Sequence, residues 1–229
     1  MKFNRLENLI GSFSLEELEK SSVLVFGLGG VGGYVVEALA RSGIGNLILV
    51  DYDKVDITNF NRQIIAVNKN IDKYKVDCFK ERIESINEDC NVVSYNLKID
   101  DNNIKDIFNT KIDFVVDAVD DVRAKVGIIN YCLDHNIDFI SSMGTGNRLD
   151  PSKLTITMLD KTCNDPLARV MRSKFDKSVQ KKITVCTSTE MPIKVKDKTV
   201  IGSNAFVPSS AGLLIASYIV RKINETKFN

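Results

Sequence analysis

The feature that most constrains this chain is the sequence GLGGVG at residues 27–32. It directly follows an apolar stretch, residues 23–26, that predicts a buried strand, and it opens a helical pattern from about residue 31. A second apolar stretch, residues 47–50, ends in Asp51 about 20 residues further on. A strand, a glycine turn, a helix and a strand that ends in an acid predict the first βαβ unit of a nucleotide-binding sheet.

The glycines of this turn indicate a phosphate site. Gly27, Gly29, Gly30 and Gly32 allow a tight turn and a close approach of phosphate to backbone amides at a positive helix terminus, while Asp51 can accept hydrogen bonds from ribose hydroxyls. These features leave NAD and ATP open. The next segment, DYDKVDITNFNRQ, concentrates Asp, Asn, Arg and Gln, which phosphate chemistry uses and hydride transfer does not need. We therefore favour ATP over NAD.

Strand and helix patterns alternate along the rest of the chain. Helices are predicted over residues 74–86 and 123–132, around Pro166, and from near Pro208; strands are predicted over 92–97, 114–119 and 139–142. Two β-branched stretches, 154–159 and 183–189, are predicted to extend the sheet as antiparallel strands. The expected fold is α/β, a Rossmann-like, doubly wound, mainly parallel sheet extended by antiparallel strands.

Length and composition predict one domain over residues 1–229, with a nucleotide-binding core of about 20–145 and an extension for substrate or dimer contacts of about 146–229. The longest apolar stretch, residues 211–220, is shorter than the roughly 20 residues that cross a bilayer, so no membrane contact and a cytoplasmic location are expected. The five cysteines are scattered without a CxxC pair, which predicts neither a disulfide framework nor a zinc site. The net charge of +1 does not decide for or against a nucleic-acid partner.

Four motifs together resemble the ThiF/MoeB/HesA family of ubiquitin-activating-type enzymes: GLGGVGG, DYDKVDITNFNRQ, Lys75 and the DAVDD of residues 117–121. The resemblance implies ATP and Mg²⁺ as cofactors, with the metal at Asp120. It also implies a homodimer in which Arg5 reaches the ATP of the neighbouring subunit. Nucleotide binding is assigned to the four glycines of the turn and to Asp51, Asp53, Asn59, Arg62, Gln63, Lys75 and Asp120.

The chemistry of adenylation suits these residues. When a carboxylate attacks the α-phosphate of ATP, negative charge builds on the phosphate oxygens, and Arg62, Lys75 and Mg²⁺ can stabilise it. Arg62, Lys75, Asp120 and Arg5 are therefore the predicted catalytic set. No general base is needed because the nucleophile is already an anion, and the single histidine, His135, is expected to have a surface or capping role. Each charged residue could instead be an ordinary surface charge, and Asp120 could merely cap the next helix.

Longer stretches resemble the tRNA-modifying branch of the family, the threonylcarbamoyladenosine dehydratases: residues 37–64, 161–175 and 188–192. This resemblance implies adenylation of the threonyl carboxylate of the modified adenosine in tRNA, followed by closure of a hydantoin ring. The alternative is activation of the C-terminus of a ubiquitin-like sulfur-carrier protein, with a sulfur-transfer partner. For tRNA contact, the candidates are Arg169, Arg172, Lys174, Lys177, Lys181 and Lys182, with a solvated helix face as the other interpretation.

Two features of the C-terminal half leave questions open. Cys186 lies where the resemblance also places a cysteine, but a thiol within an apolar strand is usually a small core residue. The segment of residues 193–202 is short compared with relatives, which affects the expected substrate contacts.

Overall fold

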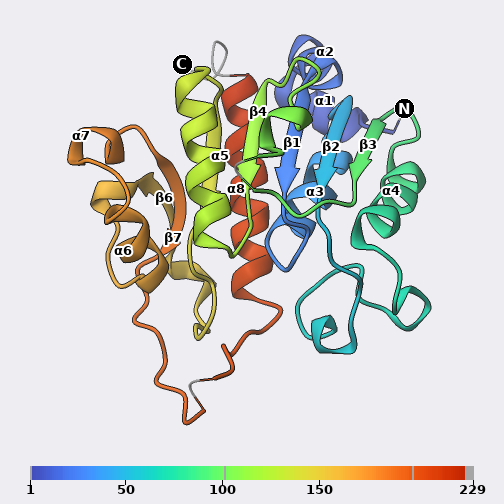
Figure 1. The fold of residues 1–229 in the computed structure, drawn as a ribbon. Helices are drawn as coiled ribbons and strands as arrows, with labels where there is room; N and C mark the ends of the chain where they lie inside the picture. Colours follow the sequence, from blue (N-terminus) through green and yellow to red (C-terminus); the bar gives the residue numbers. More distant parts are fainter. Residues whose placement is uncertain (1, 101, 198, 225–229) are drawn as a thin grey trace.

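The computed structural model describes residues 2–100, 102–197 and 199–224. Within them, the apolar stretches assemble into one seven-stranded sheet with the order β3-β2-β1-β4-β5-β7-β6 (Figure 1). Its strands are β1 (Ser22–Phe26), β2 (Asn46–Val50), β3 (Asn91–Tyr95), β4 (Phe114–Asp117), β5 (Phe139–Ser142), β6 (Leu154–Met158) and β7 (Thr184–Ser188). The predicted α/β fold with a mainly parallel sheet is confirmed.

The direction of β7 differs from the prediction. Only β6 is antiparallel to its neighbour, with Ile156 opposite Cys186, whereas β7 runs parallel to β5, with Ser141 opposite Val185. The cause is topological: β7 inserts between β5 and β6, and because those two strands run in opposite directions, β7 must be parallel to one of them and antiparallel to the other. The residue pattern of a strand carries no information about such an insertion.

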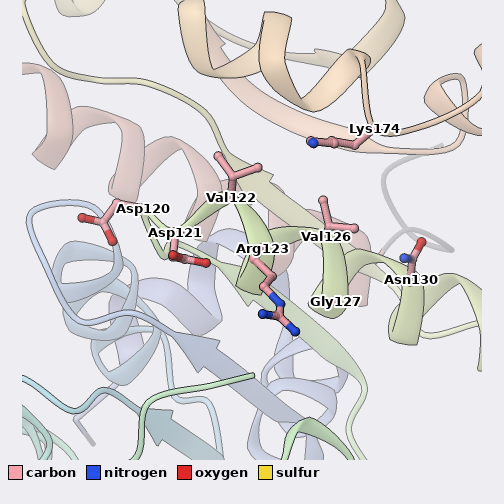
Figure 2. Close-up of a pocket in the computed structure, with 8 residues that line it drawn as sticks. All are labelled: Asp120, Asp121, Val122, Arg123, Val126, Gly127, Asn130 and Lys174. Carbon is pink, nitrogen blue, oxygen red and sulfur yellow. The ribbon is translucent and has the colours of Figure 1, made fainter. Parts of the chain in front are cut away.

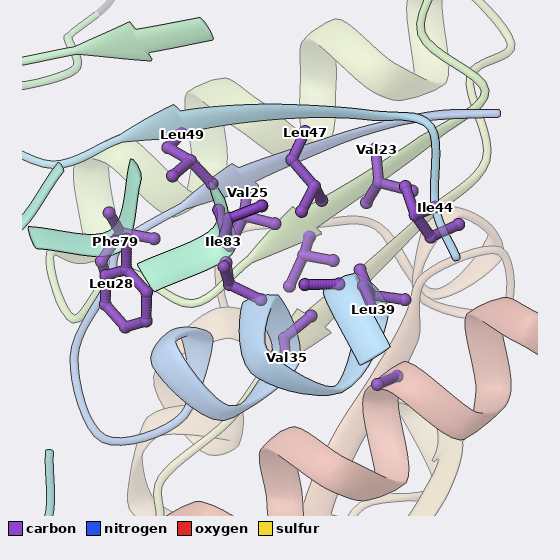
Figure 3. Packing of buried hydrophobic residues seen from close by; sticks show 14 of the residues in the cluster. Val23, Val25, Leu28, Val35, Leu39, Ile44, Leu47, Leu49, Phe79 and Ile83 are labelled. Carbon is purple, nitrogen blue, oxygen red and sulfur yellow. The ribbon is translucent and has the colours of Figure 1, made fainter. Parts of the chain in front are cut away.

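Helices cover both faces of the sheet, because alternate residues of each strand point to opposite sides (Figure 1). They are α1 (Asn4–Ile10), α2 (Ser12–Lys20), α3 (Gly32–Arg41), α4 (Lys75–Ile86), α5 (Val122–Asp134), α6 (Pro166–Arg172), α7 (Lys177–Gln180) and α8 (Val207–Ile223). Val25 packs with α3, α4 and α8 in one core (Figure 3). The adjacent Leu24 and Phe26 pack with α5 and α6 in the other core. The arrangement is doubly wound, as predicted.

Local signals set several boundaries. The predicted helix at Pro166 is α6, and Asp165 caps it by accepting a hydrogen bond from the amide of Ala168 at 3.0 Å. β4 ends at Asp117, two residues before the predicted end of the strand. Among the described residues, no helix has both the length and the apolar character that a membrane span requires.

Asn147 anchors the segment that connects β7 to α8. Its backbone N–H donates to the Gly202 carbonyl at 2.7 Å, its side-chain oxygen accepts from the Gly202 amide at 2.7 Å, and its carbonyl accepts from the Ile193 amide at 2.7 Å. Asn147 has a φ of 56°, a left-handed conformation that asparagine tolerates better than most residues. One residue therefore holds both ends of the segment 193–202.

Candidate active site

The glycine turn leads from the carboxyl end of β1 into α3 and has no room for side chains at two positions. A Cβ on Gly27, which has a φ of +84°, would lie 2.6 Å from the Ala118 carbonyl oxygen. A Cβ on Gly32 would lie 1.8 Å from the Gly27 carbonyl oxygen. The turn is therefore folded tightly against the loop after β4, and it presents its backbone at the amino terminus of α3, where an anion is favoured.

Asp51 lies at the end of β2 and is tied to this turn. One of its carboxylate oxygens accepts a hydrogen bond from the Leu28 amide at 2.6 Å, and the other accepts from the Asp53 amide at 2.8 Å. Burial raises the pKa of Asp51, and the nearby Lys75 ammonium offsets part of that rise. A carboxylate has about four lone-pair positions, so Asp51 keeps capacity for ribose hydroxyls beside the turn.

Lys75 is the first residue of α4, and its side chain is only 5% exposed. Its ammonium nitrogen lies 2.8 Å from a carboxylate oxygen of Asp53 and 4.0 Å from one of Asp51. An antiparallel bridge between Lys54 and Tyr74 holds the start of α4 against the segment after β2. The structure thus brings Lys75, Asp51 and Asp53 together at the turn, as predicted, and supplies one buried cation there.

The loop after β2 brings Arg62 and Gln63 to the same place. A Cβ on Gly30 would lie 3.5 Å from Cγ of Arg62, and a Cβ on Gly29 would lie 3.9 Å from Nε2 of Gln63. The Arg62 guanidinium donates to the Thr58 carbonyl at 2.7 Å, which fixes the side chain at the turn. Gln63 is buried, and its amide oxygen has no partner among the described residues. An unpaired buried amide beside a phosphate-type turn is a group that a ligand can satisfy.

Asn59 is buried nearby but has a local structural role. It ends the short 3₁₀ turn η1 (Ile57–Asn59), and its side-chain oxygen accepts a hydrogen bond from the Asp56 amide at 3.1 Å. The Asn59 carbonyl also accepts from the amides of Arg62 and Gln63. Asn59 therefore shapes the segment that carries the two predicted ligands, and its own contact with a nucleotide stays a prediction.

Asp120 lies in the loop that packs against the glycine turn, three residues after the end of β4. It is Asp121, not Asp120, that caps α5, by accepting a hydrogen bond from the Ala124 amide at 2.8 Å. The pKa of Tyr52, in the segment after β2, is raised first by the Asp53 carboxylate, then by burial and by Asp120. The exposed Asp120 carboxylate is thus left available for a ligand.

Arg5 is not brought to this site. It is exposed on α1, and the N-terminal helices pack at the amino edge of the sheet, where Gly43 contacts Phe3 and Gly45 contacts Glu19 ahead of β2. The glycine turn lies at the carboxyl edge of the same sheet. Within one chain, Arg5 cannot act on a nucleotide at the turn, so its predicted role depends on a neighbouring subunit.

These residues fit a nucleoside triphosphate with one metal ion. The glycine turn, the buried Lys75 and the adjacent Arg62 match phosphates, and Asp51 matches ribose. Among the described residues, no group of three or more His, Cys, Asp or Glu side chains could hold a metal ion by itself. Mg²⁺ is usually bound through one or two carboxylates together with phosphate oxygens, and Asp120 alone can supply that contact.

A second polar group, which the sequence did not reveal, lies directly beneath the site. Lys125 of α5, Asp117 at the end of β4 and Ser141 of β5 are fully buried. The Lys125 ammonium donates to the Asp117 carboxylate at 2.9 Å and to the Ser141 hydroxyl at 3.3 Å, and Ser141 donates to the same carboxylate. The available signal was a lysine on the otherwise apolar inner face of α5. The buried group of Lys125, Asp117 and Ser141 fixes the end of β4, where the loop that carries Asp120 begins.

The surroundings of Cys186 and of His135 indicate structural roles for both residues. Cys186 is 2% exposed, and burial, with a smaller contribution from Asp165, raises the pKa of its thiol to about 12. Such a thiol is not ionised at neutral pH and is a poor nucleophile. His135 follows the end of α5, where its ring stacks on Tyr131 at a centroid distance of 4.1 Å and Nδ1 lies 2.8 Å from the Tyr131 carbonyl oxygen. The expected capping role of His135 is confirmed.

Known proteins resemble this chain over nearly its whole length. The ThiF family model matches residues 3–228. The tRNA threonylcarbamoyladenosine dehydratase of Bacillus subtilis is 39% identical over 236 residues, covering 96% of this chain and 93% of that protein. The crystal structure of Escherichia coli tRNA N6-threonylcarbamoyladenosine dehydratase in complex with ATP superimposes with a TM-score of 0.93 at 30% identity, covering 98% and 94% of the two chains. A molybdopterin-synthase adenylyltransferase of Haemophilus influenzae is 32% identical, but over only 55% of this chain and 51% of that protein.

The doubly wound sheet, the closed glycine turn and the Asp51–Lys75 pair define a nucleotide-binding enzyme of the adenylating class. The chain belongs to the ThiF family.

Proposed function

We propose that this protein is an ATP-dependent dehydratase that adenylates the threonyl carboxylate of threonylcarbamoyladenosine in tRNA and closes it to the hydantoin form. The observation that carries the proposal is the gathering of Asp51, Lys75 and Arg62 around the glycine turn. The chain that holds this site is 39% identical, nearly end to end, to a tRNA threonylcarbamoyladenosine dehydratase.

In the first step, a carboxylate oxygen of the substrate attacks the α-phosphorus of ATP, and the bond to pyrophosphate breaks. The products are an acyl-adenylate and pyrophosphate. Lys75 and Arg62 stabilise the charge that develops on the phosphate oxygens, and Asp51 holds the ribose. Mg²⁺, held by Asp120, supplies further neutralisation of phosphate charge when bound.

In the second step, the neighbouring ureido nitrogen attacks the activated carbonyl carbon, and the bond to AMP breaks. The nitrogen loses its proton to solvent, and AMP leaves with one oxygen of the original carboxylate, so the nucleoside is lighter by one water. An intramolecular attack of this kind gains from proximity, and the protein need not supply a covalent nucleophile. The buried, un-ionised thiol of Cys186 agrees with that scheme.

The remaining assignments concern the whole assembly. We take residues 1–229 as one adenylating domain, with a nucleotide core of about 20–145 and an extension of about 146–229. The protein works in the cytoplasm as a homodimer in which Arg5 reaches the neighbour's nucleotide. Support comes from the position of Arg5, which lies at the edge of the sheet opposite its own glycine turn.

The test is a reaction of the purified protein with ATP, Mg²⁺ and tRNA that bears threonylcarbamoyladenosine. Mass spectrometry of the digested tRNA should show a nucleoside lighter by one water, with one AMP formed for each nucleoside converted. Lys75→Met and Asp120→Asn should lose turnover while keeping the far-UV circular dichroism of the wild type. A folded protein that binds ATP but leaves the nucleoside mass unchanged would rule the proposal out.

Activation of a ubiquitin-like carrier protein is the second candidate, because a molybdopterin-synthase adenylyltransferase matches about half of the chain. Exchange of pyrophosphate into ATP that requires a carrier with a di-glycine end, and that tRNA does not stimulate, would favour it. A sulfur-transfer partner belongs to this alternative.

A further inference from the structure

A groove of about 940 Å³ begins at Asp120, next to the glycine turn, and extends from there along α5 (Figure 2). One wall is the first half of α5, and the other is the connection between α6 and α7. Its size lies within the range of roughly 300–1,000 Å³ that is usual for ligand sites. The groove is lined by Asp120, Asp121, Val122, Arg123, Val126, Gly127, Asn130 and Lys174.

The α5 wall combines apolar and amide groups in a regular order. Val122 and Val126 are one helical turn apart and half-buried, and Figure 2 shows them facing the segment that carries Lys174. Gly127 adds no side chain, and Asn130 follows Val126 by one further turn with an exposed amide. An apolar ridge that ends in an amide suits the flat face and the polar edge of a nucleobase.

The opposite wall is positively charged. Lys174 is exposed at the groove. Within residues 169–182, the one exposed acid is Asp176. The same segment carries four more exposed cations: Arg169, Lys177, Lys181 and Lys182. Arg172 does not belong to this set, because its guanidinium turns inward and bonds to the carbonyl and hydroxyl oxygens of Thr162. The predicted group of six cations is therefore reduced to five that can meet phosphates.

Charge also differs along the groove. Asp120 and Asp121 lie at the end next to the glycine turn, and Lys174 lies on the other wall, whereas the side chain of Arg123 points away from Lys174 (Figure 2). A phosphodiester is repelled by the acids and attracted by the lysine. An RNA strand in the groove therefore has its phosphate at Lys174 and its nucleoside along the valines, directed to the end where Asp120 and the nucleotide turn meet.

We propose that this groove is the RNA subsite: it holds a single-stranded segment with the target nucleoside against Val122 and Val126, its edge on Asn130 and an adjacent phosphate on Lys174. The inference rests on the proposed function, since it assigns the place of that enzyme's substrate. A single strand is required because the faces of paired, stacked bases are not accessible to a protein wall.

The experiment compares three variants with the wild-type protein. Lys174→Glu reverses the charge at the groove, and Asn130→Asp adds a negative charge with almost no change in shape. Lys80→Glu is the matched control, because Lys80 is an exposed lysine of α4, and α4 packs against α3 and β3 rather than lining the groove. For each protein, we would measure the Kd for tRNA over a range of salt concentrations, the KM for modified tRNA, the Kd for ATP and the melting temperature.

The expected result is a Kd and KM for tRNA raised about fivefold or more by Lys174→Glu and by Asn130→Asp, with the Kd for ATP within twofold of wild type. Lys174→Glu should also lower the slope of log K against log salt by about 0.7, the value for one phosphate contact on a single strand. Lys80→Glu should change the affinity for tRNA by less than twofold.

Two results would overturn the assignment of the groove. The first leaves the proposed function intact, and the second replaces it. If the wild type converts tRNA and both groove variants behave as Lys80→Glu does, the RNA lies elsewhere. If the groove variants weaken a di-glycine-ended carrier protein and not RNA, the occupant is a polypeptide. A wild-type protein that binds RNA through the groove but forms no cyclic nucleoside would remove the proposed reaction and keep the RNA subsite.

Discussion

Removal of the buried ammonium of Lys125 is expected to destabilise the fold strongly. Lys125, Asp117 and Ser141 are each 0% exposed, so Lys125→Met keeps the length of the side chain but leaves the Asp117 carboxylate without a cation. The Asp117 carboxylate then keeps the hydrogen bonds from the Ser141 hydroxyl and from the Val119 amide, the latter at 3.3 Å. Breaking a buried ion pair from one side costs about 3–5 kcal/mol, because an uncompensated charge stays in the interior.

The measurement is urea unfolding at neutral pH, with thermal melting beside it. For a chain of this size each kcal/mol is worth about 2–4 °C, so the melting temperature should fall by roughly 6–20 °C. The double variant Lys125→Met with Asp117→Leu removes both charges and should recover most of the loss, since apolar replacement of a buried pair is often neutral. Ser141→Ala removes the two hydrogen bonds of the hydroxyl but leaves the ion pair in place, so it should cost less, about 2 kcal/mol.

The reasoning is refuted if Lys125→Met loses less than about 1 kcal/mol, or if the double variant is no more stable than the single one. The first result would mean that water or another group reaches Asp117. The second would mean that packing of the lysine side chain, not its charge, accounts for the loss.

Further predictions concern the charges and glycines near the site. Burial alone would raise the pKa of Glu37, but Arg82 and Arg41 outweigh it and hold that pKa below its ordinary value of 4.5. The stability due to the ionised Glu37 is therefore present above pH 4.5 and is lost as the pH falls through the lower pKa of the folded state. Glu37→Gln should cost about 1.5 kcal/mol in urea unfolding at pH 7, and the difference from wild type should narrow at pH 3. Lys75→Met should lower kcat/KM about 10²–10³-fold in an AMP-release assay, and a loss below tenfold would contradict its role at the phosphates. Gly32→Ala should abolish ATP binding in calorimetry, because its Cβ would lie 1.8 Å from the Gly27 carbonyl oxygen, whereas Gly29→Ala, with its nearest neighbour at 3.9 Å, should leave the fold intact.

The parts of the fold that depend on local pattern could be predicted from the sequence. Three features depend on residues close together in the chain: the turn from β1 into α3, the start of α6 at Asp165 and Pro166, and the alternation of strands and helices that gives a doubly wound sheet. The direction of β7 could not be predicted, because it depends on β7 inserting between two strands that are distant in sequence.

The site, too, has parts that could be predicted from the sequence and parts that could not. The proximity of Asp51 to the glycine turn could be predicted because the motif fixes their separation, and the proximity of Lys75 and Arg62 was implied by the family resemblance. The buried ion pair of Lys125 and Asp117 could not be predicted: the two residues are eight positions apart on different elements, and only packing shows that they meet. The choice of Asp121 over Asp120 as the cap of α5 also depends on where β4 ends.

The hydrogen bonds that Asn147 makes to Ile193 and Gly202 bear on how this protein can change its length. Because both ends of the segment 193–202 meet at one residue, chain added between them forms a closed loop whose ends stay in place. Doubling the length of such a loop costs only about 0.6 kcal/mol in closure entropy. Evolution can therefore lengthen or shorten this stretch to fit different substrates while β7 and α8 keep their positions, and an engineered insertion between these anchor points should be tolerated for the same reason.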